Sequence, residues 1–213
     1  MKLNEIYNRL SSRFSPMGWW PGDSWHEYFV GCVLAQNTNW NRVVPVIQRM
    51  KKMDILAPEK FLQLSQEQLS KVLRGAGTYR RKAEYLRIAG EYMLSIGWNG
   101  TPESVTGSTD TLRNELLELK GTGPETCDCI LLYVLERPVF VVDAYTTRIL
   151  SRHGLCNEKA KYSEVQKIFQ QGLNPDVGMF NEFHALFVEC GKQFCRPEPL
   201  CRDCPLNEKR KTP

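Results

Sequence analysis

The stretch LKGTGPETC (residues 119–127) places two glycines one residue apart between two helical segments. A helix ends just before the turn Gly121-Thr122-Gly123, and Pro124 suits the first turn of the next helix. Glycine permits positive φ and lets backbone N–H groups approach a ligand, and a helix amino terminus attracts an anion. The stretch therefore predicts a helix-hairpin-helix that grips a phosphate, with a tight turn that binds nothing as the plainer alternative.

Further along the chain, PVFVVDAYTTRIL (138–150) ends an apolar run with an acid. Asp143 precedes a helix, so its ordinary role is that of an N-cap. Residues 138–142 are rich in β-branched side chains, but no partner strand is evident, and we expect a buried extended connector.

The whole chain has the composition of a globular, mostly helical protein. It has 213 residues, 42% of them hydrophobic, enough for one large domain or two small lobes. Apolar residues recur at helical spacing, as in Trp25, Phe29 and Val33. The amino terminus lacks a signal-peptide pattern, and no apolar run approaches the ~20 residues that span a membrane. The formal charge of +4 permits a polyanionic partner without demanding one.

The hairpin, the connector, and Asp143 at the start of a helix that carries Arg148 together resemble the helix-hairpin-helix DNA glycosylases of the endonuclease III superfamily. The resemblance covers nearly the whole chain, including VGCVLAQNTNW (30–40), GTYRRKAEYL (77–86) and the cysteine-rich end. It implies an all-α, two-lobed helix-hairpin-helix glycosylase fold with a cysteine-containing C-terminal loop.

The resemblance also implies how the single domain, residues 1–213, is divided into lobes. One lobe covers approximately residues 25–135 and contains the hairpin at 119–127. The second lobe combines residues 1–24 with 136–213 and ends in the cysteine tail at 190–204.

In that family the hairpin holds a DNA phosphate through backbone amides, and an aspartate faces the sugar of a nucleotide flipped out of the duplex. Carried over, Gly121, Thr122 and Gly123 bind DNA, and Asp143 is the catalytic carboxylate. The chemistry agrees, because breaking an N-glycosidic bond builds oxocarbenium character on the sugar, which a fixed carboxylate stabilises. The same group can orient a water molecule and still cap its helix.

Family members that also cleave the strand carry a lysine where this chain has Glu125. Lysine forms the Schiff base that lyase chemistry requires, and a carboxylate cannot. The chain therefore resembles the monofunctional branch, without strong AP-lyase activity. Glu125 is a second catalytic candidate, for polarising water or contacting the base, and equally a solvated first-turn acid. Lys120 is a candidate substitute amine, although its position belongs to the hairpin turn.

The segment MGWWPGDSW, together with QNT followed by an aromatic residue, narrows the resemblance to the bacterial 3-methyladenine glycosylases of the endonuclease III type. In those enzymes aromatic side chains sandwich the extruded base. The implied base pocket comprises Trp19, Trp20, Pro21 and Trp40, although burial in the core is the ordinary role of any one tryptophan. N3-alkylated adenine is cationic, so electron-rich indole faces would attract it.

Three further features have both a functional and a plain structural interpretation. Gln36 matches the family position that fills the gap left by the flipped nucleotide, and is otherwise a buried or capping glutamine. Arg80, Arg81 and Lys82 form a basic run that suits phosphate or simply a solvated face. His184 lies on an apolar helix and is expected to be a core histidine.

The final segment contains Cys190, Cys195, Cys201 and Cys204. Many family members hold a [4Fe–4S] cluster with the pattern C-x6-C-x2-C-x5-C, whereas here C-x5-C-x2-C is followed by Arg210 in the place of the last ligand. In one interpretation Cys190 supplies the fourth thiolate, and a cluster orders the basic tail against DNA. In the other the motif has decayed, and packing or adventitious zinc holds the loop.

The sequence therefore predicts a monofunctional DNA glycosylase of base excision repair, which flips an alkylated purine such as 3-methyladenine out of duplex DNA and hydrolyses its N-glycosidic bond. We expect a cytoplasmic, nucleoid-associated monomer whose partner is double-stranded DNA with a damaged base, and which does not contact a membrane. Two alternatives are a uracil or thymine mismatch glycosylase of the same fold and a non-catalytic DNA-structure-binding protein. The tryptophans argue against the first and Asp143 against the second.

Overall fold

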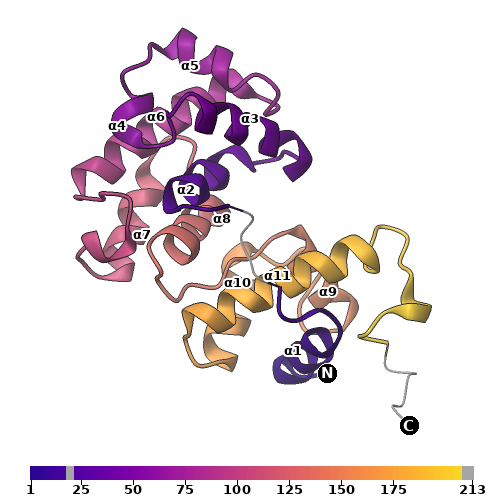
Figure 1. Cartoon of the computed structure of the whole chain (residues 1–213). Helices are drawn as coiled ribbons and strands as arrows, with labels where there is room; N and C mark the ends of the chain where they lie inside the picture. Colours follow the sequence, from indigo (N-terminus) through magenta and orange to yellow (C-terminus); the bar gives the residue numbers. More distant parts are fainter. Residues whose placement is uncertain (18–21, 208–213) are drawn as a thin grey trace. The chain divides into compact units, whose positions relative to one another are not determined.

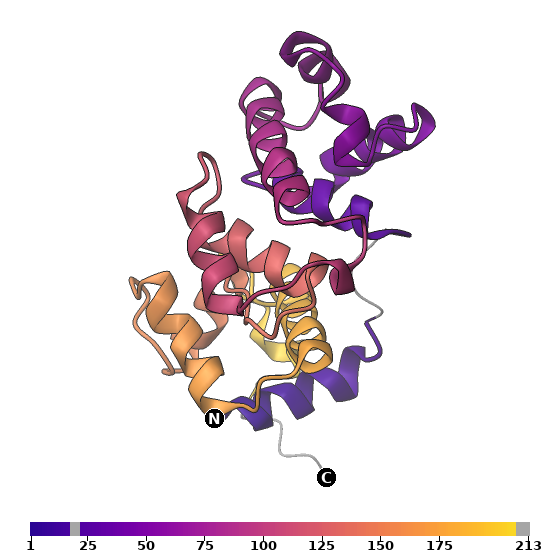
Figure 2. The same ribbon diagram turned by 90° about the vertical axis from the view of Figure 1, so that its left-hand side faces the viewer.

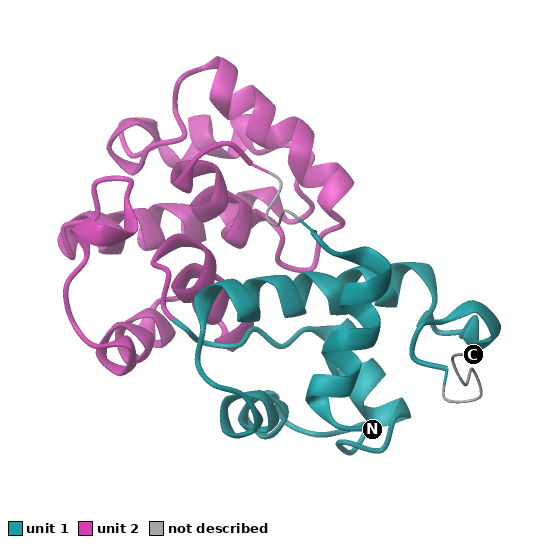
Figure 3. Ribbon diagram, turned by 60° about the horizontal axis from the view of Figure 1, so that its bottom comes forward, with its two compact units in different colours: residues 1–19, 138–213 teal, residues 20–137 magenta. Residues whose placement is uncertain are grey.

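The computed structural model describes residues 1–17 and 22–207, and these residues are mostly helical. No strand occurs within them, which confirms the all-α prediction. The chain divides into two compact units, coloured separately in Figure 3: unit 1 comprises residues 1–19 and 138–213, and unit 2 comprises residues 20–137. Within the described residues, no helix is both long enough and apolar enough to cross a membrane.

Unit 2 is built around the helix α2, which packs against α3, α6, α8 and η2. The long helix α6 also packs along α4 and α5, in the upper part of Figures 1 and 2. The elements of unit 2 are α2 (Trp25–Leu34), α3 (Trp40–Lys52), α4 (Pro58–Phe61), α5 (Gln66–Val72), α6 (Tyr79–Ser95), the 3-10 turn η1 (Pro102–Ser104), α7 (Thr109–Glu118), α8 (Pro124–Cys129) and the π-helical turn η2 (Ile130–Val134).

Short polar side chains cap several of these helices. Ser24 accepts a hydrogen bond from the Glu27 N–H at the start of α2. Ser65 and Gln68 form a reciprocal capping box at the start of α5. Each cap satisfies backbone donors that a helix leaves unpaired at its amino end.

The helix-hairpin-helix is formed by α7 and α8, and α8 begins at Pro124 as predicted. A buried ion pair joins the two helices. The Arg113 side chain donates from Nε to Asp128 Oδ1 at 2.7 Å and from Nη2 to Oδ2 at 3.1 Å, and the Asp128 side chain is 0% exposed. Bidentate pairing of this kind fixes orientation as well as distance. The hairpin turn is therefore held between two helices that are fastened together.

Unit 1 is organised by α11, which packs against α1 and α9 (Figure 1). Its core contains a cluster of phenylalanines, in which Phe140 stacks on Phe169 with ring centroids 3.6 Å apart. The apolar residues 139–142 are buried and lie outside any helix, as expected for the connector. The elements of unit 1 are α1 (Leu3–Phe14), α9 (Ala144–Arg152), α10 (Tyr162–Gly172), α11 (Val177–Gln193) and the 3-10 turn η3 (Cys201–Asp203).

Pro45 lies inside α3, beyond the first turn in which a helix ordinarily tolerates proline. The helix begins at Trp40 and continues through Pro45. Pro45 lacks the N–H that would bond the Asn41 carbonyl, so the helix loses one internal hydrogen bond. The buried face of α3 offsets this loss, and it comprises Val43, Val46, Ile47 and Met50.

Candidate functional site

Asp143 opens α9 as its N-cap, in unit 1. Its Oδ1 accepts hydrogen bonds from the Thr146 N–H at 2.7 Å and from the Thr146 hydroxyl at 2.8 Å. Its backbone carbonyl accepts one from the Thr147 hydroxyl at 3.1 Å. Immediately before it, the Val142 N–H donates to the Tyr162 hydroxyl at 3.3 Å. The carboxylate therefore has a fixed place at the end of a buried connector.

His184 of α11 lies next to the other oxygen of this carboxylate. Its Nε2 is 3.7 Å from Asp143 Oδ2, and the side chains are 7% and 13% exposed, respectively. Burial raises the pKa of Asp143, but the interaction with His184 and the two donors of Thr146 together outweigh burial and lower the pKa below its ordinary value. Asp143 is thus a largely buried carboxylate that remains ionised at neutral pH.

The two glycines of the hairpin turn serve different purposes. Gly121 has φ +88°, and a Cβ there would lie 2.2 Å from the ring of Tyr85, so packing alone demands glycine. A Cβ at Gly123 would meet no atom within 4 Å. The Thr122 N–H donates to the Leu119 carbonyl at 3.0 Å and is used within the turn. Gly123, exposed beside open space, is therefore the hairpin residue best placed to meet an outside acceptor.

Gln36 is brought to the hairpin inside unit 2. It lies in the loop 35–39 that follows α2, and its Nε2 donates to the Gly121 carbonyl at 3.0 Å. Asn37, at the exposed tip of this loop, has φ +48°, a conformation that asparagine tolerates better than most residues. Trp40 follows directly as the first residue of α3 and is half-buried.

Glu125 lies exposed in the first turn of α8. The neighbouring amine, Lys120 Nζ, lies 2.6 Å from Glu84 Oε1, and the hydrogen bond to Glu84 raises the pKa of Lys120. An amine with a raised pKa is protonated at neutral pH and is a poor nucleophile. Lys120 is therefore badly suited to replace the lysine that Glu125 displaces.

Three of the four predicted base-pocket residues, Trp19, Trp20 and Pro21, lie outside the described residues. The chain on each side of this segment is held by a glutamate. In unit 1, Glu182 accepts from the Met17 N–H at 3.2 Å. In unit 2, the buried Glu27 accepts from the Asp23 N–H at 3.3 Å and pairs with Lys51 at 2.6 Å. The two flanks of the segment are thus each fixed by a carboxylate.

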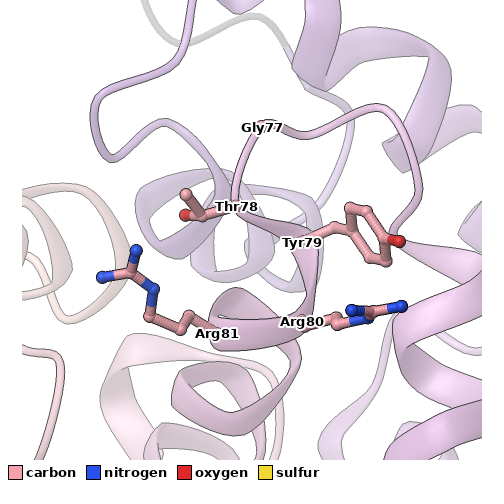
Figure 4. Close-up of a pocket in the computed structure, with 5 residues that line it drawn as sticks. All are labelled: Gly77, Thr78, Tyr79, Arg80 and Arg81. Carbon is pink, nitrogen blue, oxygen red and sulfur yellow. The ribbon is translucent and has the colours of Figure 1, made fainter.

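The basic run at the start of α6 does not form one continuous basic face. Arg80 and Arg81 are exposed beside an open hollow of about 220 Å³ that Gly77, Thr78 and Tyr79 also line. In Figure 4 the two guanidinium groups point to opposite sides of the helix start, and Arg80 lies over the Tyr79 ring at 5.8 Å. The third member of the run, Lys82, is 1% exposed and turns inward.

The four cysteines of the tail line one cavity of about 100 Å³ in unit 1. Cys190, Cys195 and Cys204 are buried, and Cys201 is exposed. A hydrogen bond with the Cys204 thiol, together with burial, raises the pKa of Cys190 far above its usual value. Four thiols around one cavity are a suitable donor set for an iron–sulfur cluster. In the part of the chain that the structure describes, however, no three such side chains are grouped as metal ligands.

Two arginines of α9 hold the backbone of the cysteine loop. Arg148 Nε donates to the Cys195 carbonyl at 2.6 Å. Arg152 donates to the carbonyls of Arg196 and Pro197 at 2.6 and 2.9 Å and to the sulfur of Cys195 at 3.3 Å. The loop is thus attached by side chains to the same helix that Asp143 begins.

Two residues, His184 in unit 1 and Lys82 in unit 2, make contacts that the sequence does not predict. His184 is buried, as expected of a core histidine, but it also contacts the predicted catalytic carboxylate. Lys82 belongs to the basic run that the sequence predicts for a phosphate contact or a solvated face, and this prediction is wrong for Lys82, which is buried. The only sequence signal for the contact of His184 is its position among the apolar residues of α11, such as Phe180 and Phe187. The sequence signal for the burial of Lys82 is its helical spacing to Leu86, since both lie on the buried face of α6 together with Ala83.

Comparison with known proteins places this geometry in a family. Residues 30–175 match the family described as HhH-GPD superfamily base excision DNA repair protein. A Methanocaldococcus jannaschii protein, provisionally named a DNA repair glycosylase, is 42% identical over 208 residues, which cover 97% of this chain and 94% of that protein. Endonuclease III of Bacillus subtilis is 26% identical over 78% of this chain and 70% of its own length.

Solved structures show the same fold. The H. pylori 3-methyladenine DNA glycosylase bound to 1,N6-ethenoadenine superposes with a TM-score of 0.77 at 27% identity, over 91% of this chain and 98% of that one. A trapped endonuclease III–DNA covalent intermediate superposes with a TM-score of 0.79 at 21% identity, over 95% and 91% of the two chains. The chain belongs to the HhH-GPD superfamily of base excision DNA repair proteins.

Proposed function

We propose that the protein is a monofunctional DNA glycosylase that hydrolyses the N-glycosidic bond of an alkylated purine flipped out of duplex DNA. It acts as a monomer on double-stranded DNA. The observation that carries the proposal is the state of Asp143, a largely buried carboxylate whose pKa is lowered by His184 and Thr146.

A carboxylate of this kind supplies what glycosidic hydrolysis needs. As the base departs, positive charge develops on the sugar, and a fixed negative charge stabilises that charge better than it stabilises the ground state. The Thr146 bonds engage Oδ1, and Oδ2 lies on the side of His184, so neither rotation nor protonation removes the charge easily. Effects of this type are typically worth about 3–4 kcal/mol of activation free energy.

Two features support water, rather than an amine, as the nucleophile. Glu125 stands where strand-cleaving members of the family carry lysine, and a carboxylate cannot form a Schiff base. Lys120, the nearest amine along the hairpin, is paired with Glu84. Gln36 and Gly123 are proposed to contact the duplex, since Gln36 touches the hairpin and Gly123 lies in open space.

The preference for an alkylated purine is supported by the likeness to the H. pylori enzyme, whose name gives 3-methyladenine as its substrate. The sequence offers Trp19, Trp20, Pro21 and Trp40 as a pocket. A cationic base stacked on indole gains about 2 kcal/mol or more when water is excluded. Such a base is also a good leaving group, so one carboxylate suffices without a strong general acid.

The test is chromatography of free bases released from methylated duplex DNA by the wild type and by Asp143→Asn, with strand cleavage scored in the same reactions. The proposal predicts release of 3-methyladenine by the wild type alone, and abasic strands that stay intact. Release of uracil or thymine from mismatched duplexes, with none from methylated DNA, would establish the mismatch alternative. Tight binding to DNA without release of any base would leave only a DNA-structure-binding protein.

A [4Fe–4S] cluster held by Cys190, Cys195, Cys201 and Cys204 is a separate part of the proposal. The shared cavity supports it, and so does the Arg152 donor beside Cys195, because donors to ligand sulfurs tune such clusters. When bound, the cluster would order the loop rather than take part in base removal. Cys190 replaces the ligand that the family pattern expects at Arg210.

Iron analysis and visible absorption of anaerobically purified protein test this assignment. We expect brown protein with about four iron atoms per chain, and loss of iron in Cys190→Ser. Cys156→Ser is the matched control, since Cys156 is a half-buried thiol that does not line the cavity. A colourless, iron-free wild type that still releases bases would remove the cluster from the proposal.

A further inference from the structure

Lys82 is a buried lysine whose ammonium group contacts neutral oxygens. The residue is 1% exposed, and its Nζ donates to the Leu34 carbonyl at 2.6 Å and to the Thr38 hydroxyl at 2.5 Å. No ion pair with a carboxylate occurs at Lys82 among residues 1–17 and 22–207. Burial lowers the pKa of Lys82 to about 8. Such a group is unfavourable to bury unless its donors are well used, so its contacts indicate what it does.

The first contact places a cation at the carboxyl end of α2. The Leu34 carbonyl belongs to the last residue of that helix, and α2 has no basic residue in its own last turn. The carboxyl end of a helix carries partial negative charge and carbonyls that lack helical partners. Lys82, which comes from α6, supplies both the charge and a donor there.

The second contact continues to Gln36. The Thr38 hydroxyl accepts from Lys82 and donates to the Gln36 carbonyl at 3.1 Å. The Gln36 side chain in turn donates to the Gly121 carbonyl in the hairpin turn at 3.0 Å. An unbroken series of hydrogen bonds therefore leads from the buried ammonium to the hairpin.

Gly77 provides the space for this series. It has φ +70°, and a Cβ built there would lie 2.7 Å from Thr38 Oγ1 and 3.8 Å from Lys82 Nζ. Any side chain would be strained and would push Thr38 away from Lys82. The turn before α6 and the loop 35–39 therefore pack closely around the ammonium group.

The same turn of α6 also braces the hairpin directly. The ring of Tyr85 occupies the space that a side chain at Gly121 would need. Glu84 pairs with Lys120 at 2.6 Å. Lys82, Glu84 and Tyr85 thus set the places of the Gln36 loop and of the hairpin from one rigid helix.

We propose that Lys82 is a positioning residue for duplex DNA binding, which acts through Thr38 to hold Gln36 against the hairpin turn. The inference rests on the proposed function, in which Gln36 and the hairpin bind DNA. Lys82 is too deeply buried to contact DNA itself, so its removal should eliminate the contribution of Gln36 and little else.

A double-mutant cycle tests the inference. Dissociation constants are measured for a duplex that contains a tetrahydrofuran abasic-site analogue, with wild type, Lys82→Met, Gln36→Ala and the double variant. We expect each single change to weaken binding about tenfold, and the double variant to be no weaker than the weaker-binding single, because both remove the same contact. Lys71→Met is the matched control, since Lys71 is an exposed lysine of α5, and it should bind like the wild type.

A conservative variant guards against loss of the fold. Thr38→Val removes the hydroxyl that relays the hydrogen bonds but keeps the shape, so it should weaken binding severalfold and show the same non-additivity with Gln36→Ala. Hydrogen exchange of the amides in residues 35–39 and 119–123 should accelerate in Lys82→Met and Thr38→Val, but not in Lys71→Met. Strictly additive effects in the cycle, or wild-type affinity and exchange in both variants, would overturn the inference.

The design separates this inference from the proposed function. If the cycle is non-additive but the wild type releases no base, the glycosylase proposal fails and the role of Lys82 stands. If bases are released and the cycle is additive, Lys82 is merely structural. A wild type that does not bind the abasic duplex at all overturns both.

Discussion

The starts of α8 and α9 each carry a carboxylate, and the two are built in opposite ways. Glu125 is exposed in the first turn of α8, whose N-cap, Gly123, has no side chain. Asp143 is itself the N-cap of α9, largely buried, bonded to Thr146 and beside His184. A fixed, buried negative charge stabilises a cationic transition state well, whereas water screens the charge of an exposed carboxylate. In the proposed mechanism Asp143 therefore supplies the negative charge for the reaction, and Glu125 matters chiefly because it is not a lysine.

The largest effect should follow from neutralising the α9 carboxylate. Asp143→Asn keeps an effective N-cap, because asparagine caps helices about as well as aspartate. Its single-turnover rate of base release should nevertheless fall by a factor of about 10³ or more, roughly 4 kcal/mol in activation free energy. The far-UV circular dichroism spectrum serves as the control and should change little. An Asn variant with more than a tenth of the wild-type rate would show that the two helix starts do not differ as proposed.

The next effect concerns the free energy of unfolding that the Arg113–Asp128 ion pair contributes at the hairpin. Asp128→Ala leaves the Arg113 guanidinium without its buried partner, and breaking a buried pair typically costs about 3–5 kcal/mol of unfolding free energy. Urea denaturation of this variant should show that loss. Asp110→Ala, at an exposed first-turn acid of α7, should lose less than about 1 kcal/mol. Equal losses in the two variants would mean that the ion pair does not fasten the hairpin.

A smaller effect is expected at the histidine beside Asp143. His184→Ala removes interactions that lower the pKa of Asp143, while burial, which raises it, persists. The acid limb of the rate profile should therefore move to higher pH, so that the rate falls more at acidic than at alkaline pH. The same change should reduce stability above the unfolded pKa of aspartate, where the lowered pKa stabilises the fold. Lys192→Ala, on an exposed face of α11, is the control. An acid limb that His184→Ala leaves unchanged would show that His184 does not affect the ionisation of Asp143.

The smallest effect should come from Glu125→Gln. Because Glu125 is exposed, removing its charge should change the rate of base release by no more than about threefold, the scale of a solvated first-turn acid. Pre-steady-state kinetics with methylated duplex can resolve this difference. A loss comparable to that of Asp143→Asn would make Glu125 the carboxylate that activates water and would reverse the comparison.

The sequence predicts the helices and the hairpin well, because their signals are local. Proline at position 124 and aspartate at position 143 mark helix starts, and both helices begin as expected. Pro45 is an exception to the local rule against proline inside a helix, because burial of the apolar face of α3 outweighs the lost hydrogen bond.

Contacts between distant residues could not be predicted in the same way. The approach of His184 to Asp143, and of Lys82 to Thr38, joins separate helices through packing that no spacing in the sequence records. Gly121 and Gly123 look alike in the sequence. Only the structure shows that Tyr85 requires the first, whereas nothing in the described chain requires the second.

The most direct test of the hydrolytic mechanism is single-turnover reaction with alkylated duplex in the presence of borohydride, which reduces a Schiff base to a stable protein–DNA adduct. The wild type should release the base, leave the abasic strand intact and form no adduct, and Lys120→Ala should behave identically. A covalent adduct with the wild type that disappears in Lys120→Ala would show that an amine, and not water, displaces the base, and would contradict the proposed mechanism.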